Sequence, residues 1–178
     1  SADRGLILLR GENGSGKSSF LKSLLSRTQS FHYAETTTVK ENASFFYLHG
    51  RLIDPGSPID FEMTFHQNIF GPMKEQDNHE AARDSIRHSL HALLPNEELL
   101  QAYWLIEFDR LFELYGNRSN ANYSEGEKVA MAFFRSIAYE KTEGCLFVFD
   151  ESIGALDENR KMMMVATIKC LALKNLII

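Results

Sequence analysis

The chain has 178 residues, of which 44% are hydrophobic and 11% aromatic, and its formal net charge is -5 at pH 7. That length fits one compact domain with a sizeable core, and the acidic balance argues against a dedicated nucleic-acid surface, which would usually be basic. The two cysteines, Cys145 and Cys170, lie in apolar segments, so free thiols in a reducing compartment are expected. No apolar run approaches the ~20 residues that span a bilayer, which predicts a soluble chain that can still dock on a membrane partner.

The first 72 residues contain two short aliphatic or aromatic runs that are typical of buried strands, at 5–10 and 44–48. A helix is predicted from Ser18 to about Leu25. The polar, threonine-rich stretch at 27–42 predicts an irregular arm, and the glycines and prolines at 50–72 predict a loop.

The rest of the chain alternates helices with strands. Helices are predicted at 77–94 (capped by Asp77), 97–115 (ended by Gly116), 126–139 and 158–173, and strands at 145–149 and 175–178. This order predicts an α/β domain over 1–178, with a parallel-sheet core at about 1–71 and 141–178 and a helical lobe at about 72–140. Both ends of the sequence look cut through a domain.

The strongest motif is the run from Gly11 to Ser18, which matches G-x-x-x-x-G-K-[ST] between a predicted strand and a predicted helix. Glycines let successive N–H groups turn inward around phosphate oxygens, and the following helix directs its positive end at the same anion. Lys17 would supply a charge for the β- and γ-phosphates, and Ser18 a hydroxyl for Mg²⁺. The predicted phosphate contacts are Asn13, Gly14, Ser15, Gly16, Lys17, Ser18 and Ser19.

A second pair of functional residues, Asp150 and Glu151, ends the strand predicted at 145–149. Ligands of α/β sheets bind at the carboxyl ends of strands. Asp150 is therefore predicted to hold Mg²⁺ directly or through water, and Glu151 to act as the general base toward an attacking water.

The third motif is Ser-Glu-Gly-Glu-Lys at 124–128, which lies before a helix and upstream of the Asp-Glu strand, and Ala-Leu-Asp follows at 155–157. This order of motifs resembles the ATP-binding cassette (ABC) ATPases, whose signature reads Leu-Ser-Gly-Gly-Gln. The resemblance implies a P-loop NTPase fold with an inserted helical subdomain, ATP and Mg²⁺ as cofactors, and ATP hydrolysis with Lys17 and Glu151 as catalytic residues. It also implies a second nucleotide-binding domain as partner. Ser124 and Gly126 would meet the γ-phosphate bound to that partner, and Asp157 would lie at the dimer interface.

The sequence departs from the family at two positions within the chain. Glu125 replaces the first signature glycine, and a carboxylate near a γ-phosphate would repel it unless the side chain points away. The glutamine that the family places after its second strand is missing: His49 or Gly50 stands at the expected place, and Gln67 comes too late. The family's switch histidine and adenine-stacking aromatic would fall outside the chain.

Two kinds of ABC ATPase fit the motifs. Thr64 to Ile69 resembles a transporter segment, and Phe61, Met63, Phe65 and Phe70 would then supply an apolar cleft for a transmembrane subunit, with the chain cytoplasmic at the inner face of a membrane. At least half of these aromatic side chains are nevertheless expected to pack in the core. The Ser-Glu-Gly-Glu-Lys signature is closer to the DNA-repair and chromosome-structure kind, although 72–122 lacks its sustained heptads. A third alternative is an ATP-gated interaction domain with weak hydrolysis.

Overall fold

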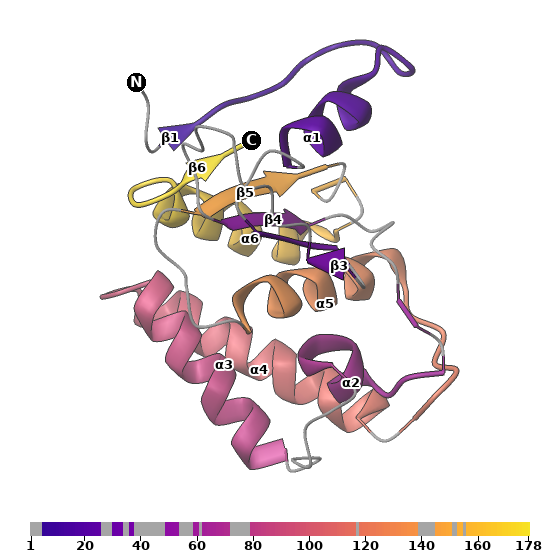
Figure 1. Ribbon diagram of the computed structural model, residues 1–178. Helices are drawn as coiled ribbons and strands as arrows, with labels where there is room; N and C mark the ends of the chain where they lie inside the picture. The colour runs from indigo at the N-terminus through magenta and orange to yellow at the C-terminus, as the bar shows by residue number, and fades with distance from the viewer. Residues whose placement is uncertain are drawn as a thin grey trace.

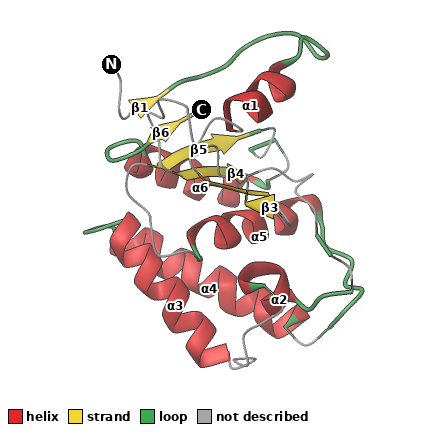
Figure 2. Cartoon of the chain, in the orientation of Figure 1, coloured by secondary structure: helices red, strands yellow, loops and turns green. Residues whose placement is uncertain are grey.

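The computed structural model describes residues 5–25, 30–33, 36–37, 49–53, 59–60, 62–71, 79–116, 118–138, 145–150, 153–154 and 156–178. Within them the helices are α1 (Lys17–Leu25), α2 (Phe65–Phe70), α3 (His79–Leu93), α4 (Glu98–Tyr115), α5 (Glu125–Ile137) and α6 (Glu158–Leu171). The strands are β1 (Gly5–Leu6), β2 (Ser30–Tyr33), β3 (Thr36–Thr37), β4 (His49–Ile53), β5 (Cys145–Phe149) and β6 (Leu176–Ile177). Figures 1 and 2 show α1 on one side of the strands, and α5, then α2, α3 and α4, on the other side.

The strands form one sheet in the order β1-β6-β5-β4-β2-β3. All neighbours are parallel except β2 and β3, which are antiparallel. The longest pairing joins β4 to β5, from His49 opposite Cys145 to Ile53 opposite Phe149. Parallel neighbours place their carboxyl ends at one edge, so Ile53 and Phe149 end side by side.

The predicted fold class requires a correction, because the structure does not fit a domain whose main core is a parallel sheet. More than half of the described residues are helical, whereas each strand has only two to five residues. The predicted strand at 5–10 shrinks to Gly5–Leu6 at the sheet edge, and the side chains at 6–9 are exposed instead of buried. Strands of a parallel core are normally covered on both faces. Most side chains of the main buried cluster, however, belong to helices.

Two further predictions in the first half of the chain are wrong. The stretch at 27–42 is not wholly irregular, since it contains β2 and β3, and the predicted loop at 50–72 contains most of β4 and all of α2. Helix α2 begins at a capping box, in which Thr64 and Gln67 satisfy each other's backbone N–H groups at 3.3 and 3.0 Å. The strand predicted at 44–48 and the Asp77 cap lie outside the described residues.

Helices α3 to α6 and strand β5 confirm the predictions made from apolar periodicity. Helices α3, α4, α5 and α6 begin and end within two residues of the predicted bounds, and β5 matches its prediction at both ends. Gly116 ends α4, and its N–H donates to the carbonyl of Phe112 at 2.7 Å. Among the described residues, no helix is both long and apolar enough to cross a membrane.

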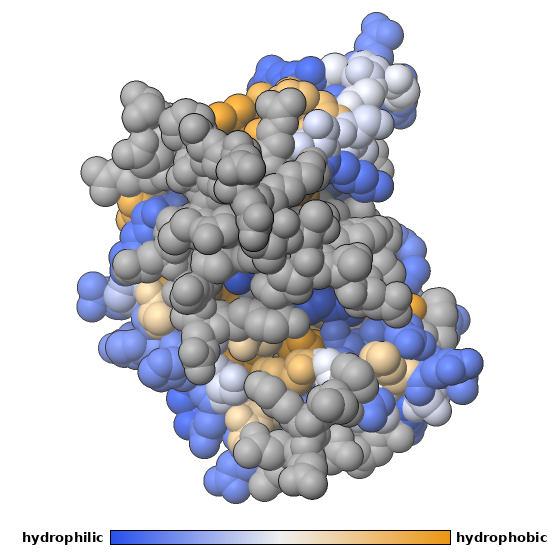
Figure 3. All heavy atoms as spheres, viewed as in Figure 1, coloured by the Kyte–Doolittle hydropathy of each residue, from blue (hydrophilic) through white to orange (hydrophobic). Residues whose placement is uncertain are grey.

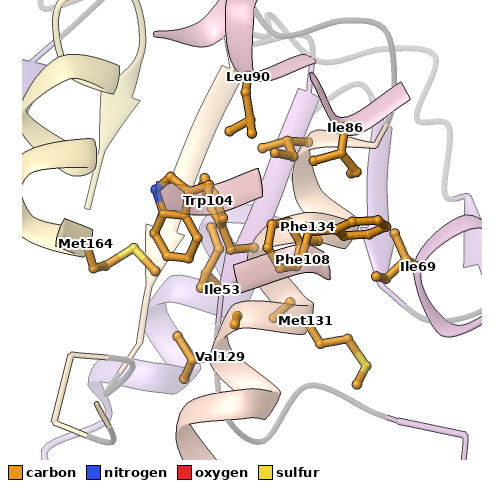
Figure 4. Close-up of a cluster of buried hydrophobic side chains, with 14 of the residues drawn as sticks. Ile53, Ile69, Ile86, Leu90, Trp104, Phe108, Val129, Met131, Phe134 and Met164 are labelled. Carbon is orange, nitrogen blue, oxygen red and sulfur yellow. The ribbon is translucent and has the colours of Figure 1, made fainter. Parts of the chain in front are cut away.

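The main core lies where α4 and α5 meet (Figure 4), and it is rich in aromatic side chains. Trp104 is 1% exposed, and its ring centroid lies 4.5 Å from that of Phe133. Its indole N–H donates to Thr167 Oγ1 at 2.8 Å, which ties α4 to α6. A smaller cluster packs Leu21 and Leu25 of α1 against Leu146 and Val148 of β5. This contact attaches α1, and with it the motif at 11–18, to the sheet.

Candidate functional site

The segment 11–18 forms a tight turn that contains two glycines with positive φ angles. Gly14 and Gly16 have φ angles of 80° and 85°, in the left-handed region that favours glycine. The N–H of Ser15 donates to the carbonyl of Glu12 at 3.2 Å, which closes a tight turn. A Cβ at Gly11 would lie 2.7 Å from Ser15 Oγ, so a larger residue there would require the Ser15 side chain to move.

Lys17 stands at the mouth of this loop as the first residue of α1. Its Nζ donates to the carbonyl oxygens of Gly11 and Glu12 at 2.9 and 2.8 Å. Both acceptors are neutral carbonyl oxygens, so neither contact is an ion pair. The first turn of α1 holds no acidic residue, and its N–H groups add the positive end of the helix dipole.

The loop is open to solvent. Residues 11–16 are exposed, and in Figure 1 the segment between β1 and α1 arches away from the strands. Apolar side chains at 6–9 are exposed beside it, and Figure 3 shows apolar surface in this upper part of the molecule. Within the described part of the chain, no hydrogen bond or ion pair joins the loop to Asp150, Ser124 or Asp157.

Asp150 follows β5 directly and is half-buried at the carboxyl edge of the sheet. Its N–H donates to the carbonyl of Ile53 at 3.2 Å, which extends the ladder between β4 and β5 by one bond. Among the described residues nothing donates to its carboxylate, so both oxygens are open to a cation or to water. Glu151, the predicted general base, lies outside the described residues.

His49 cannot replace the missing glutamine. It is the first residue of β4 and lies opposite Cys145, the first residue of β5, so it lies at the amino edge of the sheet, away from Asp150. Gly50 is likewise inside the strand. The sequence analysis placed 49–50 after a strand at 44–48, whereas the structure has both residues inside β4. Gln67 is occupied in the capping box of α2.

The partial signature forms the start of α5. Ser124 is the N-cap: its Oγ accepts from the N–H of Glu127 at 3.3 Å, and Glu127 Oε2 accepts from the N–H of Ser124 at 2.9 Å. Ser124 is exposed and Gly126 is buried. The Glu125 carboxylate pairs with Lys128 Nζ at 3.0 Å, which partly neutralises the charge that the sequence placed near a phosphate.

Asp157 is the N-cap of α6, where its Oδ1 accepts from the N–H of Arg160 at 2.9 Å. That backbone hydrogen bond, with the nearby Arg160 charge, lowers the pKa of the Asp157 carboxyl below its usual value. The residue is exposed, so the cap leaves its second oxygen near the surface, 3.2 Å from the Arg160 guanidinium. Ala155, which precedes it in the motif, lies outside the described residues.

The sequence analysis did not predict the cluster of charged side chains that lies between these two helix starts. Glu107 of α4 is 7% exposed and accepts from both Arg110 and Arg160. Burial alone would raise the pKa of the Glu127 carboxyl, but hydrogen bonds from Ser124 and Tyr115 and the charge of Arg110 outweigh it and lower that pKa. Only the i,i+3 spacing of Glu107 and Arg110 could have suggested an ion pair.

The predicted transporter segment is built into the body of the protein. Phe65 and Ile69 are 0% and 1% exposed, and Phe70 packs against the same core. The Asn68 amide donates to three backbone carbonyls, and Arg135 Nε donates to the carbonyl of Asn68 at 2.7 Å, which fixes α2 on α5. Most of the aromatic side chains assigned to a cleft are therefore core residues; Phe61 lies outside the described residues.

Neither a scan against protein-family models nor a search of curated proteins gives a match for this chain. The functional argument therefore rests on the loop at 11–18, on Asp150, and on the two helix starts at Ser124 and Asp157.

Proposed function

We propose that this chain binds ATP and hydrolyses it to ADP and phosphate as the nucleotide-binding domain of an ABC-type ATPase. The observation that carries the proposal is the loop at 11–18. Its two left-handed glycines and Lys17 at a helix start support the proposal, because together they would form a cradle for a polyphosphate. Asn13, Ser15, Ser18 and Ser19 supply further N–H or hydroxyl donors there.

Ser18 and Asp150 are the residues that would hold a magnesium ion beside the phosphates. Mg²⁺ prefers oxygen ligands and usually keeps several waters, binding through one or two protein groups and the phosphates. Ser18 offers a hydroxyl, and Asp150 offers a carboxylate to which no described residue donates. When bound, the ion would neutralise charge on the β- and γ-phosphates.

The remaining chemistry belongs to the chain's own side chains. Lys17 would leave the carbonyls of Gly11 and Glu12 and hold the transferring phosphate, and Glu151 would accept a proton from the attacking water. Ser124 and Gly126 would contact the γ-phosphate bound to a second copy or a related subunit, with Asp157 at the same interface. ATP would then hold two domains together until hydrolysis separates them.

The binding step is tested by comparing two lysines of the same helix. Lys17→Ala is expected to abolish ATP binding, measured by calorimetry, because it removes the charge at the loop. Lys22→Ala, which removes an exposed lysine from the last turn of α1, is the matched control and is expected to bind like the parent. Equal affinity of the parent and Lys17→Ala would contradict the assignment.

The catalytic step is tested with Glu151→Gln, which keeps the size of the side chain but removes the base. Turnover per chain is expected to fall by about 10²–10⁴-fold, the usual contribution of a general base. Turnover of the parent should also rise with protein concentration, since each site needs a partner. A parent that hydrolyses ATP no faster than Glu151→Gln supports instead the third alternative, an ATP-gated interaction domain.

The ATP cycle could drive one of two processes, transport across a membrane or a function in DNA repair or chromosome structure. Transport through a transmembrane partner relies on an apolar cleft at 61–70, whereas the burial of Phe65 and Ile69 favours a non-transport ATPase of the DNA-repair or chromosome-structure kind. The coding sequence on both sides of this chain discriminates them. A transmembrane segment or an adjacent gene for a membrane protein supports transport, and flanking coiled-coil sequence supports the alternative.

A further inference from the structure

A continuous series of ion pairs connects the start of α6 with the start of α5. Beginning at α6, Asp157 Oδ2 lies 3.2 Å from Arg160 Nη1, and Arg160 Nη2 lies 2.8 Å from Glu107 Oε1. The same oxygen of Glu107 lies 2.9 Å from Arg110 Nη2.

The series continues from Arg110 to the cap of α5. Arg110 Nη2 lies 3.3 Å from Glu127 Oε1, and the other oxygen of Glu127 accepts from the N–H of Ser124 and from the Tyr115 hydroxyl, at 2.9 and 3.1 Å. Every step from Asp157 to Ser124 is thus a direct contact between charged or hydrogen-bonding groups.

The centre of this series is shielded, and its ends are exposed. The side chain of Glu107 is 9% exposed and that of Glu127 is 11% exposed, whereas the side chain of Asp157 is 57% exposed and Ser124 is an exposed residue. Glu107 receives guanidinium groups from its own helix and from α6, so it is the only carboxylate in this described group that joins α6 to α4. A buried carboxylate between two guanidinium groups depends strongly on its partners, because removing one leaves a charge uncompensated.

We propose that Glu107 is a positioning residue that couples the orientation of the α6 start, with Asp157, to the orientation of the α5 start, with Ser124. This proposal rests on the function proposed above, in which both starts lie at the interface with the partner and Ser124 contacts the partner's nucleotide. Shape alone does not require an ion pair at this place, because Trp104 and Thr167 already attach α4 to α6 through the core. The series of ion pairs additionally fixes the orientation of the exposed α6 start relative to the exposed α5 start.

The first experiment measures the coupling without nucleotide, by amide hydrogen exchange at 124–128. Arg160→Met keeps the aliphatic stem but removes the ion pairs, and the Ser124 amide, which donates to Glu127, is expected to exchange several-fold faster. In a Glu107→Gln background the same Arg160→Met change should add nothing. Lys161→Met is the matched control, since Lys161 is the next residue of α6 and pairs only with Glu158 of its own helix.

The second experiment measures ATP-dependent dimerisation by sedimentation. Glu107→Gln is expected to raise the ATP concentration for half-maximal dimer formation about tenfold, within the range of about 5- to 150-fold typical of coupled sites. ATP binding by the single chain should stay as in the parent, because the loop at 11–18 is not in contact with Glu107. Glu107→Asp should recover part of the loss.

The two experiments separate failure of the coupling from failure of the function. Additive exchange effects of Arg160→Met and Glu107→Gln, or an increase in exchange spread evenly over α3 to α6, would overturn the proposal, because a purely structural role predicts either. A parent that does not bind ATP would overturn the proposed function, and the exchange experiment would then decide the coupling alone.

Discussion

The most informative single perturbation outside the loop is Glu127→Gln, because it changes one charge and keeps the capping box. Glutamine at this position still accepts from the N–H of Ser124 and from the Tyr115 hydroxyl. The change converts charge-assisted hydrogen bonds, worth about 1.5–3 kcal/mol, into neutral ones worth about 0.5–1.5 kcal/mol. Arg110 keeps Glu107 as a partner, so we expect a loss of about 1–2 kcal/mol in the free energy of unfolding at pH 7.

The stability difference between the parent and Glu127→Gln should depend on pH, and the lowered pKa of Glu127 determines the direction of that dependence. The pKa of Glu127 in the folded chain lies below its ordinary value of 4.5, so its stabilising contribution is fully present above that value. It is lost as the pH falls through the folded pKa, because the protonated carboxyl resembles the amide. The difference between parent and Glu127→Gln should therefore be constant from pH 7 to about pH 5 and shrink below 4.5.

Urea unfolding followed by fluorescence measures this difference directly, since Trp104 is the one tryptophan of the sequence and lies in the core. With a urea slope of about 2 kcal/mol per molar, the midpoint should move by roughly 0.5–1 M at pH 7. Subtracting the variant from the parent cancels the other carboxylates, which titrate in both. A difference that is absent at pH 7, or that does not shrink below pH 4.5, would refute the role assigned to the Glu127 charge.

Three other predictions test the core, the loop and the thiols. Thr167→Val should destabilise the fold by about 1–3 kcal/mol, because it leaves the buried Trp104 N–H without its acceptor, whereas Thr167→Ser should cost less; equal losses in urea would contradict this. In Gly14→Ala the added Cβ meets nothing within 4 Å, but the φ of +80° costs an alanine about 1–2 kcal/mol. The ATP affinity measured by calorimetry should therefore fall about tenfold, and an unchanged affinity would count against a role of this loop in binding. Burial raises the pKa of both thiols, but Cys145 is fully buried and Cys170 only partly, so a thiol reagent should modify Cys170 first and Cys145 only on unfolding, as peptide mass mapping would show.

The sequence predicted those elements whose side-chain period is long and clear. The helix from Glu98 to Tyr115 repeats apolar residues over five turns and ends at Gly116, so both its face and its end were predictable. The strand from Cys145 to Phe149 is an uninterrupted apolar run and is buried at its first four positions. In such segments local propensity and tertiary packing favour the same structure.

The predictions failed where tertiary contacts choose between equivalent local patterns. The run at 6–9 is as aliphatic as a buried strand, yet its side chains are exposed, because β1 pairs with β6 over only two residues at the sheet edge. Strand β4 contains Gly50 and Arg51, so its composition does not predict a buried strand. The strand forms because five of its residues pair with β5. Short strands of this kind depend on neighbours that the linear sequence does not identify.

The buried charges were missed for a related reason. Glu107 lies on a helix face that apolar periodicity assigns to the core, beside Phe108 and Leu111. A charged residue there is tolerated because Arg110 and Arg160 neutralise it, and Arg160 is 53 positions away in the chain. Long-range ion pairs leave no periodic signal, so only the structure could show this group.

The start of α5 shows how one short motif can serve both the fold and the site. The spacing of Ser124 and Glu127 is that of a capping box, so helix initiation alone accounts for both residues. That role does not remove Ser124 from chemistry. A serine hydroxyl has two acceptor lone pairs and one donor hydrogen, and the cap uses the oxygen as an acceptor from the Glu127 N–H. The donor hydrogen remains for a phosphate oxygen, and Glu125, paired with Lys128, presents less negative charge to it than the sequence suggested. The helix cap and the proposed γ-phosphate contact are therefore compatible uses of the same hydroxyl.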